Sequence, residues 1–507
     1  FRPGEADGPG SHANAREPIQ APDGPWVKGV RDDVANGEIA GYRDTLILDG
    51  TSFTWEPFHW RTFWFIRVHV EPGPHAVTLR DASYRYTTYP VELKASFDAG
   101  RQDYAEIMEM SWRTLRLCSH ETFEDCPYYE QLHYLGDARI EALTHMYLTG
   151  DTDYVRHSIS LYRNSHRWGG LVDSRTPSYD PQIIPYFALL WVLMVEDLWE
   201  FAGDRETEFL RTCFHAIEGV LTYFRSRLRP DGFVGKVDPW NMVDRADEWP
   251  RGEPPALVAG ESTYLSCLFI AAINAASRLF RNLGDPDDAY RWERLSMRLT
   301  PLVREGAWSE TEGLFLEGPN RTQDRLSQHS QALAILSGVA NQEQIDRIRT
   351  RLVGDPLLIP MKLMQGYYFA RALEQIGDYR AFHDVVLDPW HAMRAAHLST
   401  CAEYWPGRSD CHAWSSWPAL DFIRTILGIR PGAPGFASIL IQPVTDGLDH
   451  AAGGMESPAG MVNVEWSASD GVTTLTANTP KGVPVTVRLP SGIQQHYPEG
   501  GRIDLKG

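Results

Sequence analysis

The sequence predicts a multidomain protein in which a ring of paired helices, an (α/α)6 toroid, is flanked by an N-terminal and a C-terminal antiparallel β-sandwich. Three observations predict this fold. Apolar and polar residues alternate before about residue 100 and again after residue 428, as they do in strands. Between these limits the apolar period is helical, and Gly-Asp pairs separate successive helix patterns. The predicted domains are residues 1–101, 102–428 and 429–507.

The composition is that of a globular protein. The 507 residues carry a formal net charge of −19, and the acidic excess repels nucleic-acid phosphates. The longest apolar stretch, residues 183–195, is shorter than the roughly 20 residues of a membrane span. Six cysteines without a CxxC pair indicate neither a disulfide scaffold nor a zinc ribbon. We expect a soluble chain with no nucleic-acid or membrane partner, while its oligomeric state and compartment stay open.

The first domain contains short alternating runs at residues 62–70 and 76–79, separated by the turn Glu71-Pro-Gly-Pro74. Such runs are typical of antiparallel strands. The opening 40 residues lack periodicity and fit an extended arm or part of an incomplete sandwich. The chain also begins at Phe1 without a methionine, so a leader is expected to be either removed or not included.

The middle domain is divided by Gly-Asp pairs into helical hairpins. Glycine tolerates the left-handed conformation that ends a helix, and the aspartate can cap the helix that follows. The segment Pro185–Leu198 is apolar all round, as expected of a buried inner helix. A ring of helices fits this pattern better than the alternative, an irregular solenoid. The pairs lie at residues 150–151, 203–204, 284–285 and 377–378.

The last domain reverts to alternation of apolar and polar residues. Turn residues, mostly glycine and proline, separate the runs, which predicts a small antiparallel sandwich. The runs are residues 437–442, 462–466, 473–477 and 485–489.

Carboxylates gather where the helical domain begins. Asp125, Glu130 and Asp137 lie in a loop that enters a helix, and Pro127 gives that loop an extended approach. Crowded carboxylates raise at least one pKa, and a general acid must hold its proton near neutrality. The competing interpretation is that these residues cap a helix or face solvent.

A second acidic segment, residues 398–414, precedes the last helix of the same domain. Glu403 lies there between an apolar run and two aromatic residues, and His412 is the polar residue expected beside it. A buried carboxylate needs a partner, a hydrated cavity or a substrate. An ordinary surface loop explains the segment equally well. If the ring brings its first and last hairpins together, the two carboxylates form the pair that glycoside hydrolysis requires.

These segments resemble the inverting α-L-rhamnosidases of glycoside hydrolase family 78. The resemblance rests on Asp125-Cys-Pro127 with the Gly136-Asp137 that follows it, and on the later Thr400-Cys-Ala-Glu-Tyr-Trp405. Ser409-Asp-Cys-His412 and Gly428-Ile-Arg-Pro431 extend it in the same order along the chain. It covers about residues 55–466.

The resemblance implies that Glu130 protonates the leaving oxygen and that Glu403 activates water. It further implies that Asp125 and Asp137 hold sugar hydroxyls and that His412 helps to hold the ring. The family pattern reads Arg-Asp-Glu-Arg where this chain has Tyr129-Glu-Gln-Leu132, and the interval to Asp137 is one residue shorter. That difference removes two basic groups and one acid, so we expect a divergent branch acting on a rhamnoside or another 6-deoxy sugar.

Two further loops mix aromatic and charged residues as a sugar subsite does. Residues 170–182 contain Arg175, and residues 237–244 contain Trp240 and Asp244. We regard these three side chains as candidate substrate-binding groups, although capping and solvent exposure explain them nearly as well.

The function that the resemblance implies is an exo-acting, inverting hydrolase that releases terminal α-L-rhamnose from glycosides or polysaccharide fragments. One alternative is a polysaccharide lyase that uses Tyr134, His133 and Arg175 on uronates. Another is a sugar-binding relative without activity. The sequence shows neither a paired-histidine metal motif nor a phosphate loop, so we expect no cofactor and no metal.

Overall fold

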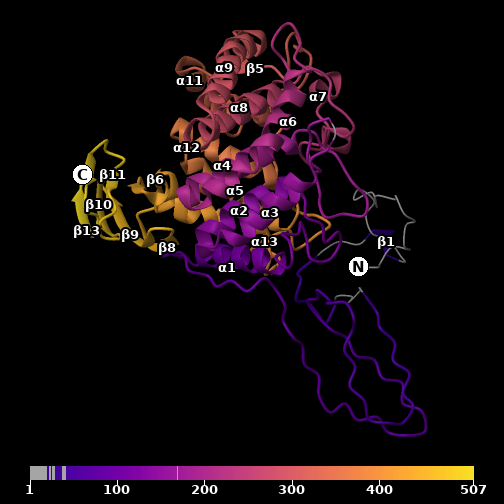
Figure 1. Cartoon of the computed structure of the whole chain (residues 1–507). Helices are drawn as coiled ribbons and strands as arrows, with labels where there is room; N and C mark the ends of the chain where they lie inside the picture. Colours follow the sequence, from indigo (N-terminus) through magenta and orange to yellow (C-terminus); the bar gives the residue numbers. More distant parts are fainter. Residues whose placement is uncertain (1–19, 22–23, 26–28, 37–41, 168) are drawn as a thin grey trace.

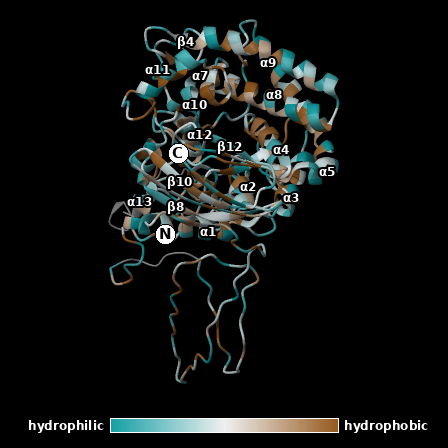
Figure 2. Ribbon diagram, turned by 90° about the vertical axis from the view of Figure 1, so that its left-hand side faces the viewer, coloured by the Kyte–Doolittle hydropathy of each residue, from teal (hydrophilic) through white to brown (hydrophobic). Residues whose placement is uncertain are grey.

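A computed structural model describes residues 20–21, 24–25, 29–36, 42–167 and 169–507. Figure 1 shows a helical body with a β-structured C-terminal part at one side. The N-terminal part of the chain, before the first long helix, extends as long open loops beyond the body (Figures 1 and 2).

The N-terminal sandwich expected over residues 1–101 is not seen in the described part of that range. The strands there are β1 (Gln20–Ala21), β2 (Gly24–Pro25) and β3 (Ser96–Asp98), and residues 42–95 run as irregular chain. Apolar side chains in this stretch face solvent, as with Phe58 at 97% exposure. Alternation alone does not make a sandwich, because strands also need an apposed layer to bury their apolar side chains. The rest of the predicted domain lies outside the described residues.

The helical body begins directly after β3. Its longer helices are α1 (Gln102–Leu117), α2 (Leu135–Thr149), α3 (Asp153–Asn164), α4 (Phe187–Ala202), α6 (Phe214–Arg225), α8 (Thr263–Leu283), α9 (Pro286–Ala307), α10 (Gln328–Leu336), α11 (Gln342–Leu352), α12 (Leu363–Ile376) and α13 (Asp388–Ala395). The shorter segments are η1 (Gly203–Glu206), α5 (Thr207–Arg211), η2 (Pro250–Gly252), α7 (Pro255–Ala259), η3 (Phe382–Val386), η4 (Ala413–Ser415), α14 (Pro418–Asp421) and η5 (Phe422–Ile426). A short hairpin of β4 (Trp308–Ser309) and β5 (Leu314–Phe315) separates α9 from α10.

The inner helices contact one another in the order in which they follow along the chain. Helix α4 lies between α2 and α8, α10 lies between α8 and α12, and α14 contacts α2. Every residue of α2 is buried, and α4 is apolar on almost every side. Figure 2 shows hydrophobic residues gathered on α4 and α8. The core of the molecule therefore lies among these helices, and the first and last of them are neighbours.

The predicted hairpin joints show how the helices are ended. Gly150 ends α2 at φ 72°, and the Asp151 carboxylate then accepts the backbone N–H of Tyr154 in α3. Gly284 differs, because it ends α8 at φ −124° outside the left-handed region. Asp285 nevertheless caps α9 by accepting the N–H of Asp287.

Helix α8 is long and apolar enough to cross a membrane by length and composition. However, 83% of its most apolar window is buried inside the protein. Its contacts with α4, α6, α9 and α10 account for that burial.

The C-terminal part consists of two sheets. One has the strand order β13-β10-β9-β8-β3 and the other β12-β11-β7-β6, and all pairings are antiparallel except the parallel β11–β7 pair. Their bounds are β6 (Ile429–Ala433), β7 (Ser438–Ile441), β8 (His450–Ser457), β9 (Gly460–Ser469), β10 (Val472–Asn478), β11 (Val485–Arg488), β12 (Gln494–Tyr497) and β13 (Arg502–Lys506). Trp466 of β9 donates its indole N–H to the Ile426 carbonyl at 2.9 Å, which fixes this sheet to the helical body.

Candidate active site

The loop between α1 and α2 folds back on itself and presents Glu130. The Asp125 N–H bonds the Leu132 carbonyl, and the Asp125 carboxylate accepts the Leu132 N–H, both at 2.9 Å. Within this closed loop the Gln131 N–H bonds the Cys126 carbonyl at 3.1 Å, and Gln131 adopts a positive φ of 55°. The loop is therefore held by its own backbone, with Glu130 at the turn.

A second loop, between α13 and η4, carries Glu403 and His412 to the same place. The Cys401 N–H bonds the Thr114 hydroxyl of α1 at 2.7 Å, and the Ala413 N–H bonds the Asp125 carbonyl at 2.9 Å. The early and late acidic segments thus touch directly. Trp414 donates its indole N–H to the Glu403 carbonyl at 2.8 Å and fixes the backbone there.

One guanidinium group lies against both candidate catalytic carboxylates. Arg408 Nη2 donates to Glu130 Oε1, and Arg408 Nε lies 3.5 Å from Glu403 Oε2. Arg245 Nη2 donates to the other oxygen, Glu403 Oε1, at 3.0 Å. Glu130 and Glu403, separated by most of the helical body in sequence, therefore belong to one charged cluster.

The two carboxylates differ in exposure. The Glu403 side chain is 1% exposed, whereas that of Glu130 is 27% exposed. Burial opposes ionisation of Glu130, but the charge and hydrogen bond of Arg408 outweigh it and hold its pKa below the usual glutamate range. Arg408 therefore favours the ionised form of Glu130.

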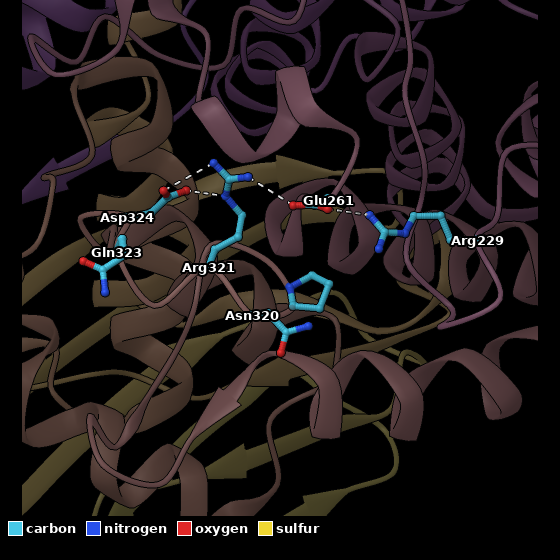
Figure 3. Close-up of a pocket in the computed structure, with 7 residues that line it drawn as sticks. Arg229, Glu261, Asn320, Arg321, Gln323 and Asp324 are labelled. Atoms are coloured by element: carbon cyan, nitrogen blue, oxygen red, sulfur yellow. Dashed lines mark hydrogen bonds and ion pairs between the residues drawn. The ribbon is translucent and has the colours of Figure 1, made fainter.

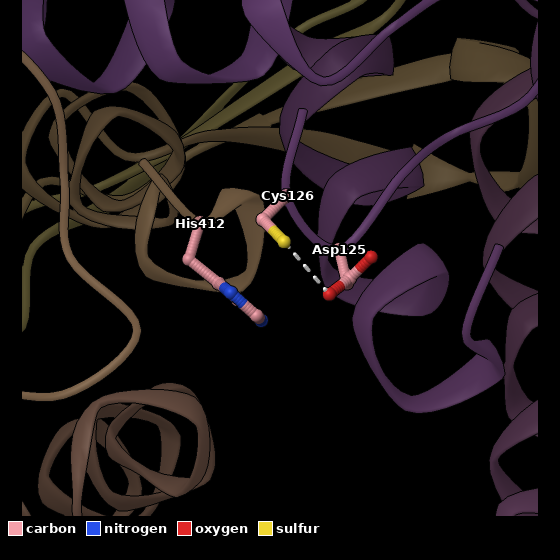
Figure 4. Close-up of side chains that lie close together, drawn as sticks. All are labelled: Asp125, Cys126 and His412. Atoms are coloured by element: carbon pink, nitrogen blue, oxygen red, sulfur yellow. Dashed lines mark hydrogen bonds between the residues drawn. The ribbon is translucent and has the colours of Figure 1, made fainter. Parts of the chain in front are cut away.

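Asp125 and Asp137 are both buried beside His412 (Figure 4 shows Asp125 and His412). Burial, followed by the negative charge of Glu130, raises the pKa of Asp125 to about 8. Burial also raises the pKa of Asp137, although a 3.1 Å hydrogen bond from His412 Nε2 opposes it. Burial acts to lower the pKa of His412, but Asp137 and the nearby carboxylates raise it overall. The cluster can therefore offer both donors and acceptors to a polyhydroxylated ligand.

Asp125, Cys126 and His412 lie close enough to share a metal ion, because their ligand atoms are within 4.8 Å of one another. The Cys126 thiol donates to Asp125 Oδ2 at 3.1 Å (Figure 4). Burial raises the pKa of this thiol well above its usual value, which disfavours the thiolate that a metal binds. This donor set suits hydrogen bonding to a sugar better than it suits a metal ion.

Asp244 adjoins the cluster but uses its oxygens within the protein. Its Oδ2 accepts from His329 Nε2 at 2.7 Å and from the Lys362 N–H at 2.8 Å, and its Oδ1 accepts the Arg245 N–H at 2.7 Å. These bonds order the loop from which Arg245 reaches Glu403. The arrangement is that of a positioning residue, and the direct sugar contact of Asp244 stays a prediction.

Arg175 reaches the cluster through Tyr134, the residue that precedes α2. Its Nη1 donates to the Tyr134 hydroxyl at 2.9 Å, and its Nη2 lies 3.3 Å from Asp180. Trp240 packs against the core, and its buried indole N–H has no hydrogen-bond partner within the described chain. Among the described contacts, Trp240 is not joined to the carboxylate cluster.

The residues suggested for a lyase are poorly suited to that chemistry. His133 is buried, bonds Thr176 and Ser158, and has its pKa lowered to about 3 by burial. Burial and the charge of Glu130 raise the pKa of Tyr134, which disfavours a tyrosinate base. His133 is therefore a structural residue, and this alternative is not favoured.

Two cavities lie away from the carboxylate cluster. One, of about 340 Å³, is lined by surface ion pairs in which Glu261 accepts from Arg229 and Arg321, each at 3.1 Å (Figure 3). The other, of about 650 Å³, contains Arg139, Asp197 and Glu374 among its lining residues. Their charged side chains are already paired with one another.

Sequence reasoning missed Arg408 and Arg245. Arg408 lies within the segment that drew attention to Glu403, and Arg245 follows Asp244 directly. Neither position has a spacing that indicates its partner. Two guanidinium groups thus reach the carboxylates from two different loops.

Comparison with known proteins identifies the chain's relatives. The family model for the bacterial alpha-L-rhamnosidase 6 hairpin glycosidase domain matches residues 92–419, and that for the bacterial alpha-L-rhamnosidase C-terminal domain matches residues 428–504. An alpha-L-rhamnosidase of Alteromonas sp. (strain LOR) is 23% identical over 408 residues, covering 74% of this chain and 41% of that protein.

Solved structures show the same fold. The GH78 rhamnosidase of Bacillus sp. GL1 is 26% identical with a TM-score of 0.72, over 80% of this chain and 44% of that one. The alpha-L-rhamnosidase of Streptomyces avermitilis, complexed with L-rhamnose, has a TM-score of 0.68 at 15% identity, over 82% of this chain and 42% of that one. The chain thus spans less than half the length of these relatives. Because the hairpin-domain model covers more than half of the chain, the protein belongs to the bacterial α-L-rhamnosidases of glycoside hydrolase family 78.

Proposed function

We propose that the protein is an exo-acting, inverting glycoside hydrolase that releases terminal α-L-rhamnose from a carbohydrate substrate. The observation that carries the proposal is the contact of one guanidinium, Arg408, with both Glu130 and Glu403. Two carboxylates from opposite ends of the helical body are thereby brought to one site. Membership in the α-L-rhamnosidase family supports rhamnose as the sugar released, and one related structure was solved with L-rhamnose.

In the proposed reaction the protonated Glu130 donates its proton to the glycosidic oxygen while the bond between that oxygen and the anomeric carbon breaks. Glu403 accepts a proton from the water whose oxygen attacks that carbon from the opposite face. Inversion needs carboxyl groups about 6.5 to 9.5 Å apart, so that this water fits between them. Free rhamnose leaves in the inverted configuration, and exchange with solvent returns a proton to Glu130 and removes one from Glu403.

Asp125, Asp137 and His412 are proposed to bind the sugar hydroxyls. All three are buried beside the carboxylate pair and include both hydrogen-bond donors and acceptors. Arg175 is proposed to contribute to sugar binding through its hydrogen bond to Tyr134. Trp240 is proposed to offer a surface on which an outer part of the substrate stacks.

We further propose that the inner helices form the (α/α)6 ring and that residues 429–507 form a sandwich domain. The succession of contacts from α2 through α12, together with the contact of α14 with α2, supports the ring. A ring explains why loops far apart in sequence meet at the site.

Replacing either catalytic carboxylate tests the function. We expect Glu130→Gln and Glu403→Gln each to lower turnover of an aryl α-L-rhamnoside by about 100-fold to 10,000-fold, because each removes one proton transfer. The β-anomer of rhamnose should appear first in proton NMR of the wild-type reaction.

Asp247→Asn is the matched control, because Asp247 is almost fully exposed. Near-wild-type turnover in either glutamine variant would exclude that residue from the mechanism. Initial formation of the α-anomer would exclude inversion.

A further inference from the structure

Arg408 is placed to act on both carboxylates at once. It contacts Glu130 through Nη2 and approaches Glu403 through Nε, so its two partners engage different edges of the same planar group. Its side chain is 17% exposed, and charge pairs with so little solvent are weakly screened. Movement of this one side chain therefore changes the electrostatic surroundings of both partners.

Tyr129 also holds Arg408 in place. Its guanidinium lies over the Tyr129 ring at 4.8 Å from the centroid, and the Tyr129 hydroxyl donates to the Arg408 carbonyl at 3.0 Å. Tyr129 immediately precedes Glu130, so the loop that presents the acid also orients the arginine. Such a planar, stacked group is well suited to contact two carboxylates.

The neighbouring arginine makes a narrower set of contacts. Arg245 donates to Glu403 at 3.0 Å and acts on Glu130 only at longer range. The two arginines thus share one carboxylate, while Arg408 alone among the described side chains bonds Glu130 by an ion pair. This difference provides an internal comparison.

We propose that Arg408 is a positioning residue that couples the acid to the base and sets which of them carries the proton. This inference rests on the proposed function. In the free enzyme Arg408 holds Glu130 ionised. When the sugar enters between the carboxylates, Arg408 gives up Glu130 and keeps Glu403, so that Glu130 can take a proton from solvent while Glu403 stays ready to accept one from water.

Other charged groups face the same pair and set the background against which Arg408 acts. His412 and Arg245 favour ionised Glu130, whereas Glu130 in turn acts on Asp125, Asp137 and Tyr134. Glu403 is faced by Arg245, Arg408, His412 and Tyr404. These groups remain in place when Arg408 alone is changed.

The pH dependence of kcat/KM distinguishes this role from a merely structural one, because it reports the ionisation of the free enzyme. In Arg408→Ala the acid loses its ion pair, so its proton is retained to higher pH. We expect the alkaline limb to move upward by about one pH unit or more, since a neighbouring arginine lowers a carboxyl pKa by about 1–3 units. We also expect kcat/KM at the optimum to fall by about 100-fold through loss of positioning.

Arg245→Gln is the matched comparison, and it should move the alkaline limb less than Arg408→Ala does. Added guanidinium chloride, below its denaturing range, should restore part of the activity of Arg408→Ala but none to Glu403→Gln. Arg408→Lys keeps a charge that cannot engage both carboxylates with one planar group, and it should shift the profile by an intermediate amount. It decides the question if the alanine variant fails to fold.

An alkaline limb that coincides with that of the wild type in Arg408→Ala, or in Arg408→Lys where only that variant folds, would overturn the proposal. Equal displacement in the Arg245 and Arg408 variants would also overturn it. These results differ from failure of the proposed function, in which Glu130→Gln and Glu403→Gln would themselves remain active.

Discussion

Among individual residues, Asp125 shows how one side chain can serve both the loop and the site. Its Oδ1 accepts the Leu132 N–H and its Oδ2 accepts the Cys126 thiol, while its backbone carbonyl binds the late loop through Ala413. Burial raises its pKa to about 8 from the usual 3.8. A proton bound to this carboxyl at neutral pH is therefore part of the folded state.

This raised pKa makes the stability contribution of Asp125 depend on pH. Between pH 3.8 and about 8 the unfolded chain releases a proton that the folded chain keeps, so rising pH favours unfolding. Asparagine keeps the oxygen that accepts the Leu132 N–H but carries no such proton. We expect Asp125→Asn to gain stability relative to the wild type as pH rises through this window.

Urea denaturation of both proteins at several pH values checks this prediction. Asp32→Asn, in an exposed side chain, serves as the control. A stability difference for Asp125→Asn that does not change with pH would contradict the assignment of the proton.

Some of the site could be predicted from residues alone, and some could not. Asp125, Glu130, Asp137, Glu403 and His412 stand in recognisable local patterns, and they meet in the structure. Arg408 could not be assigned, because its partner Glu130 is 278 positions away and an ion pair between distant loops leaves no periodic trace. The hydrogen bonds of Asp244 to His329 and Lys362 could not be predicted either, because their partners lie far away in the sequence.

At the scale of elements, the start of α2 illustrates how close packing positions a carboxylate. A Cβ atom at Gly136 would lie 2.5 Å from Phe187 Cζ in α4 and 2.7 Å from Met364 Cε in α12. Three inner helices therefore meet at the residue directly before Asp137. Helix propensity did not reveal this, since glycine inside a helix is ordinarily unfavourable.

Gly136→Ala tests this packing. Inserting a methyl group into a filled core costs about 1–3 kcal/mol of unfolding free energy, and the displaced helix start should also raise KM through Asp137. Gly73→Ala is the control, because nothing lies within 4 Å of its Cβ position. Thermal unfolding and steady-state kinetics measure the two effects, and an unchanged Tm would contradict the packing argument.

The strand predictions differed at the two ends of the chain for a physical reason. Residues 462–466 alternate and form part of β9, with Val462, Val464 and Trp466 buried. Residues 62–70 alternate as well, yet Ile66 and Val68 are more than half exposed and no strand is formed there. Apolar residues alternate with polar ones in both segments, but only residues 462–466 have neighbouring strands and a covered face.

For the whole molecule, Glu374 joins the helical body to the C-terminal sheets. It lies in α12 and pairs with Arg371 of the same helix at 2.7 Å, with Arg424 of η5 at 2.8 Å and with Arg430 of β6. Burial opposes its ionisation, but the three guanidinium groups lower its pKa to about 2.

We expect Glu374→Gln to destabilise the protein by roughly 3–5 kcal/mol, because it leaves buried arginines without their partner. The contribution of Glu374 is fully present above the ordinary glutamate value of 4.5 and is lost as pH falls toward about 2. Denaturant unfolding at pH 7 and at progressively lower pH measures both effects.

Glu310→Gln, at an exposed ion pair, should change stability little. A loss in Glu374→Gln no larger than in this control would show that the three arginines do not depend on Glu374.

The hydrogen bond between Ala413 and Asp125 can form only after the late loop has been translated. Glu130 is translated long before Glu403, so a nascent chain that stops short of the late loop lacks one of the two proposed catalytic carboxylates. Conversely, a single break of the chain between β4 and β5 leaves this junction untouched, so the two fragments should still bring Glu130 and Glu403 together.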